Sequence, residues 1–233
     1  MAIIKTENLT KTYKIASEHA RALENINLEV EEGQIVVILG PSGSGKTTLL
    51  NLLSGLDKKT SGKIFYSGRD ISRYSDSKMT RFRKKNLGFI FQTYNLLEHL
   101  NVYENILVGK KLGDKKIDIL EIMDTVGLKK HAKKAMYQLS GGEQQRVSIA
   151  RAIAKNPKVM FCDEPTGALD EKTGKIVLES LVDINEKYNT TMIIITHNPG
   201  IAFIGDKIIR MNSGHIIEEK ENKRMNPKEI PWG

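Results

Sequence analysis

A glycine-rich loop at residues 40–47 constrains the fold of this 233-residue chain more than any other feature. Its sequence, GPSGSGKT, satisfies the phosphate-binding pattern G-x-x-x-x-G-K-[ST] at every fixed position. The apolar run at 34–39 before it predicts a strand, and residues 48–56 after it predict a helix. This order of elements predicts an α/β fold with an anion site at the loop, whereas a glycine turn before an ordinary helix is the simpler alternative.

Each part of this loop suits a phosphate chain. Glycine lets the backbone curl so that its amide hydrogens point inward, and the helix beginning near Lys46 presents its positive end to the same anion. We expect Lys46 to reach the outer phosphates and the Thr47 hydroxyl to coordinate magnesium. The residues predicted to bind nucleotide here are Gly40, Pro41, Ser42, Gly43, Ser44, Gly45, Lys46, Thr47 and Thr48.

The rest of the chain alternates between strand-like and helix-like patterns. Apolar or alternating runs predict strands at 3–8, 22–30, 62–66, 87–91, 159–162, 191–196, 207–211 and 215–219. Residues 101–134 instead have helical spacing, which indicates an inserted helical subdomain. Residues 222–233 are polar and predict a loose tail, with Trp232 anchored either to this chain or to a neighbour.

Composition and charge narrow the class of protein. Hydrophobic residues make up 39% and charged residues 27%, which is ordinary for a folded domain. The one cysteine, Cys162, excludes an intrachain disulfide, and without a leader peptide or a membrane-length apolar run we expect a cytosolic protein. The net charge is +8, with basic residues gathered at 81–85, 110–116 and 129–134, where solvated helix faces are favoured over a polyanion site.

Two adjacent carboxylates end the predicted strand at 159–162. Successive side chains of an extended segment point in opposite directions, so Asp163 can turn toward the magnesium of Thr47 while Glu164 faces another part of the site. A carboxylate beside a terminal phosphate can polarise an attacking water. A simple solubilising cap on the strand is the alternative, and we favour the functional role because the phosphate loop requires such a partner.

A second glycine-rich segment, LSGGE at residues 139–143, precedes a helix predicted at 144–155. Ser140 as the N-cap with Glu143 three residues later forms a capping box, which by itself accounts for both residues. The consecutive Gly141 and Gly142 go beyond that box, because they expose amides for close approach to an oxygen-rich ligand. A nucleotide has one phosphate tail, so two unlike anion sites suggest that they meet it from opposite sides, from two copies of the chain.

From residue 3 to residue 219 the chain resembles the nucleotide-binding subunits of ABC transporters, with the motifs in family order. Tyr13 matches the aromatic that stacks on adenine, and Gln92 matches the glutamine that senses magnesium and the membrane partner. Asp170 matches the dimer-contacting aspartate, and His197 matches the switch histidine. Taken singly, each of these four is more often a packing or solvated residue.

The resemblance implies a complete set of roles and partners. The fold would be a P-loop ABC ATPase core at 1–221, with an N-terminal antiparallel β subdomain, a helical insertion at about 93–157 and a tail at 222–233. ATP and Mg2+ would be the cofactors, and a head-to-tail homodimer would hold each ATP between the loop of one copy and Ser140 to Glu143 of the other. Glu164 would be the general base, His197 would contact the terminal phosphate, and the metal would be held by Thr47, Gln92 and Asp163.

The same resemblance implies a partner and excludes rivals. Residues 85–92, 95–97 and 163–170, with Gly167 as the telling position, are most similar to the lipoprotein-release, macrolide-export and antimicrobial-peptide-export group. Such subunits lie peripherally on the inner face of the cell membrane, attached only through an integral-membrane permease. A soluble ABC ATPase acting on nucleic acid is the alternative, but the chain has one cassette and no long coiled-coil insertion. A non-hydrolysing regulator would lack Lys46, Glu164 or His197.

Overall fold

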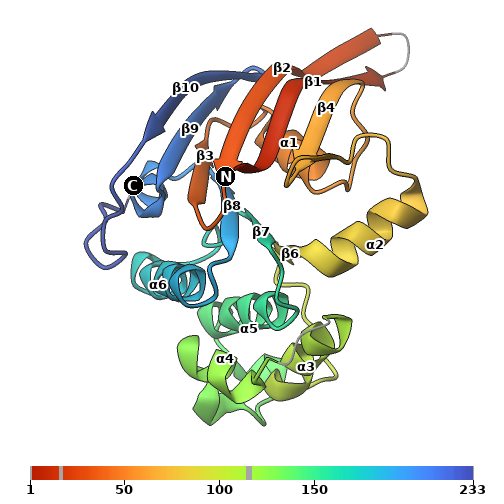
Figure 1. Cartoon of the computed structure of the whole chain (residues 1–233). Helices are drawn as coiled ribbons and strands as arrows, with labels where there is room; N and C mark the ends of the chain where they lie inside the picture. Colours follow the sequence, from red (N-terminus) through yellow and green to blue (C-terminus); the bar gives the residue numbers. More distant parts are fainter. Residues whose placement is uncertain (1, 16–17, 114–116, 233) are drawn as a thin grey trace.

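The computed structural model describes residues 2–15, 18–113 and 117–232 and contains two β-sheets and the helices that pack against them (Figure 1). The first sheet has the strand order β2-β1-β4-β5, and the second has the order β10-β9-β3-β8-β7-β6. The first sheet comprises β1 (Ala2–Ile15), β2 (Glu18–Glu31), β4 (Ser61–Tyr66) and β5 (Arg69–Asp70). The second comprises β3 (Ile35–Leu39), β6 (Leu87–Ile90), β7 (Val159–Asp163), β8 (Thr191–Thr196), β9 (Lys207–Asn212) and β10 (His215–Glu221).

Of the helices in the described residues, two each follow a strand of the second sheet, one follows β5 of the first sheet, and three lie in the insertion. They are α1 (Lys46–Leu53), α2 (Asp76–Asn86), α3 (Val102–Leu112), α4 (Ile119–Thr125), α5 (Gly141–Ile153) and α6 (Glu171–Tyr188). Three short 3-10 segments complete the described residues: η1 (Lys129–His131), η2 (Met136–Gln138) and η3 (Pro199–Ile204). In Figure 1 the insertion helices α3 and α4 lie below α5, farthest from the antiparallel sheet. The expected α/β fold with an antiparallel β subdomain is confirmed.

The central strands β3, β7 and β8 of the six-stranded sheet are buried on both faces, which explains their apolar sequences. β3 pairs in parallel with β8 and β9, and β7 pairs in parallel with β8 and β6, so only β10 runs antiparallel to its neighbour. Ile35 and Val37 face a core shared with α3 to α6, whereas Val36 and Ile38 face a core shared with α1 and the antiparallel sheet. Alternate residues of a strand point to opposite faces, so one apolar run fills both cores.

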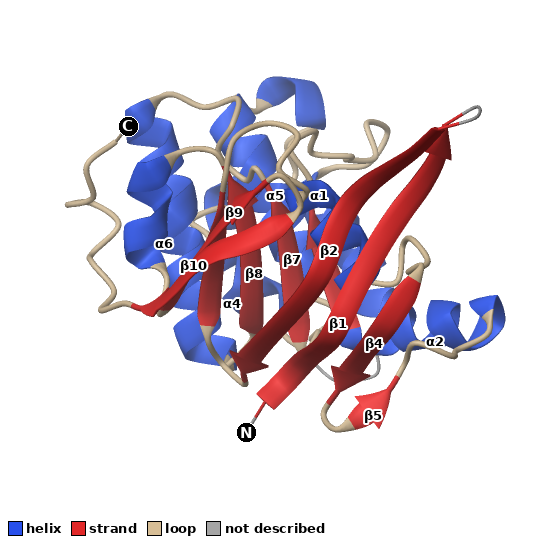
Figure 2. Cartoon of the chain, turned by 90° about the horizontal axis from the view of Figure 1, so that it is seen from above, coloured by secondary structure: helices blue, strands red, loops and turns tan. Residues whose placement is uncertain are grey.

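The two sheets lie over one another rather than side by side. Figure 2 shows the long β1–β2 ribbon crossing above the strands of the six-stranded sheet. Ile4, Leu9 and Leu28 of this ribbon are buried against the shared core. Among the described residues, no helix combines the length and the apolar character that crossing a bilayer requires.

The element positions expected from sequence are largely confirmed, and the differences have physical causes. The helix after the phosphate loop begins at Lys46 and ends at Leu53 instead of covering 48–56. Helix α2 was not expected, because it has no fully buried residue and therefore no apolar stripe to read. β1 runs on to Ile15, well past the expected end at residue 8, because its far half pairs with β2 through polar residues.

The basic clusters sit mostly at helix ends. Arg83, Lys84 and Lys85 form the last turn of α2, and Lys110 and Lys111 the last turn of α3, where positive charge complements the helix dipole. Residues 114–116 of the second cluster lie outside the described residues. This placement agrees with solvated helix faces.

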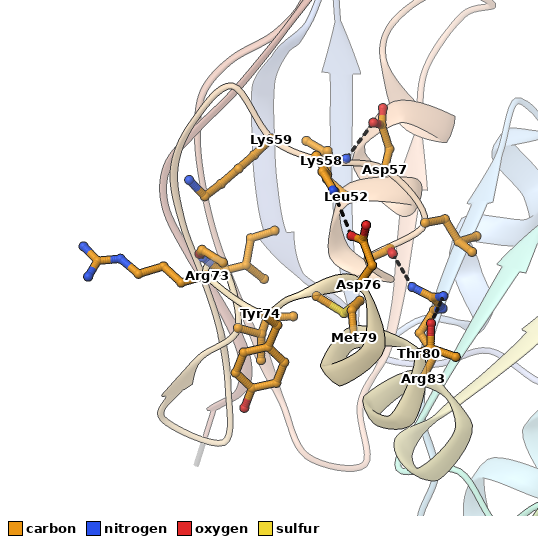
Figure 3. A pocket seen from close by; sticks show the side chains of 15 residues that line it. Leu52, Asp57, Lys58, Lys59, Arg73, Tyr74, Asp76, Met79, Thr80 and Arg83 are labelled. Atoms are coloured by element: carbon orange, nitrogen blue, oxygen red, sulfur yellow. Dashed lines mark hydrogen bonds and ion pairs between the residues drawn. The ribbon is translucent and has the colours of Figure 1, made fainter.

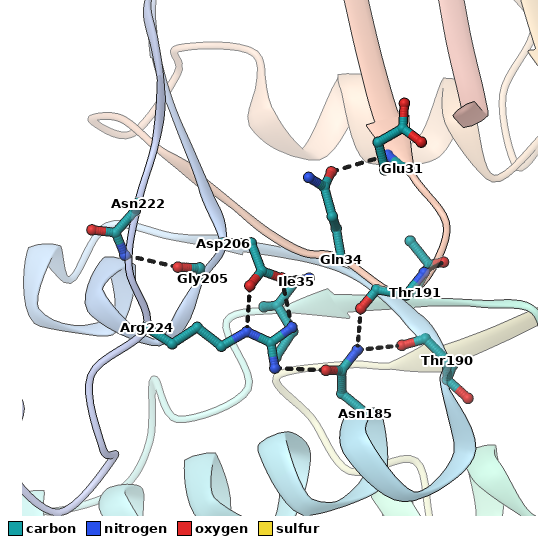
Figure 4. A network of polar contacts seen from close by, with 11 residues as sticks. Glu31, Gln34, Ile35, Asn185, Thr190, Thr191, Gly205, Asp206, Asn222 and Arg224 are labelled. Atoms are coloured by element: carbon teal, nitrogen blue, oxygen red, sulfur yellow. Dashed lines mark hydrogen bonds and ion pairs between the residues drawn. The ribbon is translucent and has the colours of Figure 1, made fainter. Parts of the chain in front are cut away.

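The expectation of a loose tail is wrong, because residues 222–232 are docked on the body of the protein. Arg224 donates from Nε to Asp206 Oδ1 at 2.6 Å and from Nη1 to Asn185 Oδ1 at 2.7 Å (Figure 4). Ile230 is only 1% exposed and belongs to the core under the six-stranded sheet. The polar composition of this segment did not indicate that it is docked, because a few long-range contacts are enough to hold it and composition does not show them. Trp232 packs on this chain.

We expect Ile230→Ala to lower the free energy of unfolding by about 2–5 kcal/mol, the usual cost of truncating a buried isoleucine. Chemical denaturation of the purified chain measures it. Ile217→Ala is the matched control, because Ile217 is 63% exposed and its loss should change stability little. Equal stability of the two variants would contradict the docked position of the segment.

Candidate functional site

The phosphate loop joins the end of β3 to the start of α1. Gly45 is the N-cap of α1 with φ of 99°, a left-handed conformation that favours glycine over residues with a Cβ. Lys46 is only 8% exposed, and its Nζ donates to Gly40 O at 2.7 Å and to Pro41 O at 2.9 Å. The loop carbonyls therefore hold the ammonium group over the loop, where an anion would be a stronger acceptor than a carbonyl.

The carboxylate of Glu164 is fixed by three donors. Its backbone has φ of 46°, which turns the chain sharply after β7. Oε2 accepts from the Thr196 hydroxyl at 2.9 Å, and Oε1 accepts from the His197 backbone N–H at 2.9 Å and faces His197 Nδ1 at 2.8 Å. A carboxylate can only accept here, so Nδ1 carries the proton and a neutral His197 ring leaves Nε2 as an acceptor.

One cavity of about 790 Å³ brings the separate motifs together. The loop from Pro41 to Thr48 forms one wall, and Gln92, Asp163, Glu164 and His197 form the other. These segments are far apart in sequence and meet because the carboxyl ends of parallel strands share one edge of the sheet. The structure thus collects the predicted loop, metal and catalytic residues at one place.

The electrostatics of this cavity favour a cation beside the carboxylates. Burial raises the pKa of Asp163, the charge of Glu164 raises it further, and Lys46 acts in the opposite direction. Thr47, Gln92 and Asp163 line the same cavity and offer the oxygen ligands that magnesium prefers. Among the described residues, no group of three or more His, Cys, Asp or Glu could hold a metal alone.

Tyr13 lies outside the cavity and is tied to Asp57. Its hydroxyl donates to Asp57 Oδ2 at 2.7 Å, and Lys11 Nζ lies 4.5 Å from its ring centroid. Burial raises the pKa of Tyr13, and the hydrogen bond to Asp57 adds to this. Asp57 also lines a second cavity of about 470 Å³ between α1 and α2, whose lining includes Lys58, Lys59 and Arg73 (Figure 3). Tyr13 does not itself line the phosphate loop's cavity, but its hydroxyl also hydrogen-bonds with the side chain of Thr48, a residue of the cavity wall, and that bond lowers its pKa.

The segment from Ser140 to Glu143 begins α5 and does not line the cavity. The expected capping box is present: Ser140 N donates to Glu143 Oε2 at 2.7 Å, and Glu143 N donates to Ser140 Oγ at 3.3 Å. Gly142 has a packing reason of its own, because a Cβ there would lie 2.1 Å from Thr173 Cγ2. The sequence argument that both glycines serve a ligand was thus incomplete for Gly142, which lets α5 approach α6.

Asp170 is the N-cap of α6 and also lies outside the cavity. Its Oδ1 accepts from Thr173 N at 3.0 Å. Two further residues were missed from sequence: Thr196, which holds Glu164, and Asp57, which holds Tyr13. Thr196 directly precedes His197, and this position next to a predicted site residue is the sequence signal that could have identified it. No neighbouring residue in the sequence indicates a role for Asp57.

Comparison with known proteins agrees with this geometry. The family model described as "ABC transporter" matches residues 23–167, more than half of the chain. The chain belongs to the ABC transporter family. It is 45% identical over 231 residues to an ABC transporter ATP-binding protein of Mycoplasma pneumoniae, named as a homologue of MG065, covering 98% of this chain but 49% of that protein. The chain thus spans about half the length of that relative.

Two other relatives are matched along most of their length. The bacitracin export ATP-binding protein BceA of Halalkalibacterium halodurans is 40% identical over 226 residues, covering 94% of this chain and 88% of that protein. MJ0796 of Methanocaldococcus jannaschii is 40% identical over 228 residues, covering 94% of this chain and 97% of that protein. A dimeric structure of MJ0796 in a post-hydrolysis state with ADP and Pi superposes with a TM-score of 0.83, 37% identity and coverage of 95% and 100%. This cassette therefore has the ABC ATPase fold.

We expect Gly142→Ala to destabilise the cassette by about 1–3 kcal/mol through overpacking against Thr173. In a Thr173→Ala background the contacting methyl is gone, so the same change should cost less than half as much. Thermal or denaturant unfolding of the four proteins gives this coupling free energy. Additive effects would show that the packing of α5 on α6 is not what requires glycine here.

Proposed function

We propose that this chain is the ATP-hydrolysing subunit of an ABC transporter and works as an ATP-dependent head-to-tail homodimer. One observation carries the proposal: the cavity unites the phosphate loop with Asp163, Glu164 and His197, while the segment beginning at Ser140 lies outside it. That segment is exposed at Ser140 and presents the N-terminal end of α5. A second copy can thus supply Ser140, Gly141, Gly142 and Glu143 to the phosphate tail, with Asp170 at the same interface.

In this dimer the residues of one copy bind and orient the nucleotide. Lys46 would exchange its loop carbonyls for the outer phosphates, and Thr47, Gln92 and Asp163 would hold magnesium. Magnesium bound by these residues would supply positive charge against the phosphate oxygens. Tyr13 would stack on adenine at the Thr48 end of the phosphate loop, where the two side chains meet.

Glu164 would act as the general base, and the hydrogen bonds from Thr196 and His197 that hold its carboxylate support this role. It would polarise a water aimed at the terminal phosphate. His197 can donate to that phosphate from Nε2 only when both ring nitrogens carry protons, or after it leaves Glu164. Its side chain is 68% exposed, so the ring has room for either change.

The proposed partner is an integral-membrane permease, with export or mechanotransmission as the proposed task. A hollow of about 560 Å³ follows Gln92 and is lined by Tyr94, Asn95, Tyr137 and Gln144 among others. Tyr137 is 86% exposed, an unusual position for a large aromatic side chain. Arg151 of α5 donates to Asn95 O at 2.7 Å, which links this surface to the helix that begins at Ser140.

The location and class of partner follow from this assignment. The cassette would lie peripherally on the inner face of the cell membrane and attach only through the permease. The sequence similarity to BceA, which is named for bacitracin export, supports assignment of this chain to the export group. No reported relative is named for work on nucleic acid, so that alternative receives no support.

We expect Glu164→Gln to lower ATP turnover by at least about hundredfold while an ATP-bound dimer accumulates, because binding groups remain and the base is lost. A phosphate-release assay and gel filtration with ATP measure the two effects. Lys46→Ala is the matched control, since it removes the phosphate cation and should abolish both turnover and dimer. Only monomer for Glu164→Gln at saturating ATP would contradict the proposal.

We expect a photocrosslinker in place of Tyr137 to label an integral-membrane protein in intact cells, since Tyr137 is exposed beside the hollow after Gln92. Mass spectrometry of the crosslinked band identifies the partner. A crosslinker at Ile217, exposed on β10, is the control and should give no such product. Crosslinks to nucleic-acid-bound proteins alone would favour the alternative function.

A further inference from the structure

Residues 222–232, here called the strap, run from β10 across η3 to the first turns of α6 (Figure 2). The strap is anchored at its start by backbone bonds: Asn222 N donates to Asp206 O at 2.6 Å, and Met225 N donates to Phe203 O at 2.8 Å. Arg224 adds its contacts with Asp206 and Asn185 (Figure 4). Asp206 Oδ2 in turn accepts from Ile35 N at 2.8 Å, so the anchor is continuous with β3.

The far end of the strap makes two very close contacts, each at a glycine. A Cβ added at Gly200 would lie 1.9 Å from Pro231 O, and one added at Gly174 would lie 2.1 Å from Trp232 Cη2. Gly200 belongs to η3 and Gly174 to α6. The strap thus bridges these two elements at points where no side chain fits beneath it.

The contact on α6 lies directly behind residues of the proposed dimer interface. Gly174 N donates to Asp170 O at 2.8 Å, so the indole rests on the turn that begins at Asp170. The neighbouring Thr173 is the residue against which Gly142 packs. Trp232 therefore packs on the same turn of α6 that carries Asp170 and contacts the start of α5.

The contact on η3 leads back to the carboxylate of Glu164. Gly200 N donates to Asn198 Oδ1 at 2.8 Å, and Asn198 N donates to Thr196 Oγ1 at 3.1 Å. The same Thr196 hydroxyl donates to Glu164 Oε2 at 2.9 Å. A continuous series of contacts thus runs from Pro231 to the proposed general base.

We propose that the strap clamps η3 to the first turns of α6, and that Trp232 is a positioning residue for ATP hydrolysis. It fixes the segment carrying Glu164 and His197 relative to the segment carrying Asp170. Hydrolysis requires the base of one copy to be aligned with the interface formed by both copies. The relative position of these two segments therefore sets the rate. This inference rests on the proposed function.

The test compares two ways of displacing the indole. Trp232→Ala removes it, and Gly174→Ala forces it out with a Cβ while placing a better helix former in α6. Each should lower kcat by about tenfold to a hundredfold, because small misplacements of catalytic groups are costly. KM for ATP should stay within about twofold, since the strap packs on η3 and α6 rather than on the phosphate loop.

Two controls separate positioning from general damage. Trp232→Phe keeps a ring over Gly174 and should restore most of kcat. Lys228→Ala removes an exposed pair with Glu179, at 2.7 Å, and should leave kcat and KM unchanged. Circular dichroism verifies that each variant is folded. If Trp232→Ala does not fold, the kcat of Gly174→Ala tests the positioning role instead.

Trp232 is the only tryptophan of the chain, so its fluorescence reports on the strap directly. In Glu164→Gln, addition of ATP and magnesium should shift its emission as the dimer forms. Trp232→Phe in the same background should abolish that signal.

Three results would overturn the inference: kcat within about twofold of wild type in a folded displacement variant, a loss carried by KM alone, or unchanged emission while the dimer forms. Absence of ATP hydrolysis by the wild-type chain would instead overturn the proposed function, and the positioning role with it.

Discussion

The arrangement of the site depends on the in-register parallel pairing of β3, β8 and β7. Leu39 pairs with Thr196, and Asp163 pairs with Ile195, so the residues that follow these strands emerge at one edge of the sheet. Both faces of the sheet are covered, which holds this register because a one-residue slip would reverse every buried side chain. This pairing places three segments around one cavity: the phosphate loop, the Asp163–Glu164 pair and His197. The three segments are far apart in the sequence.

The chemistry of the cavity follows from its charges. Asp163 and Glu164 are adjacent and partly buried, which raises the pKa of Asp163, and Lys46 provides the opposing charge. Hydrogen bonds from Thr196 and His197 hold the Glu164 carboxylate in one orientation. Preorganised groups of this kind cost little reorganisation when a reaction occurs.

The start of α5 has two explanations that do not compete. Ser140 and Glu143 complete a capping box, and Gly142 permits contact with Thr173, so the fold of one chain already requires this sequence. The exposed position of Ser140 outside the cavity adds the proposed role toward a second copy. Ser140 can cap its own helix and also contact a second copy, because its capping bonds lie within the chain while the residue remains exposed.

The sequence by itself determined the phosphate loop, most strands and the capping box at Ser140, because each depends on neighbours within a few residues. The tertiary structure alone decided four matters: helix α2, the bond from Thr196 to Glu164, the attachment of Tyr13 to Asp57, and the docking of the strap. Helix α2 has no buried stripe, and the other three depend on contacts between residues that are far apart in sequence. Periodicity records which face of an element is buried, but only the folded chain shows what lies against it.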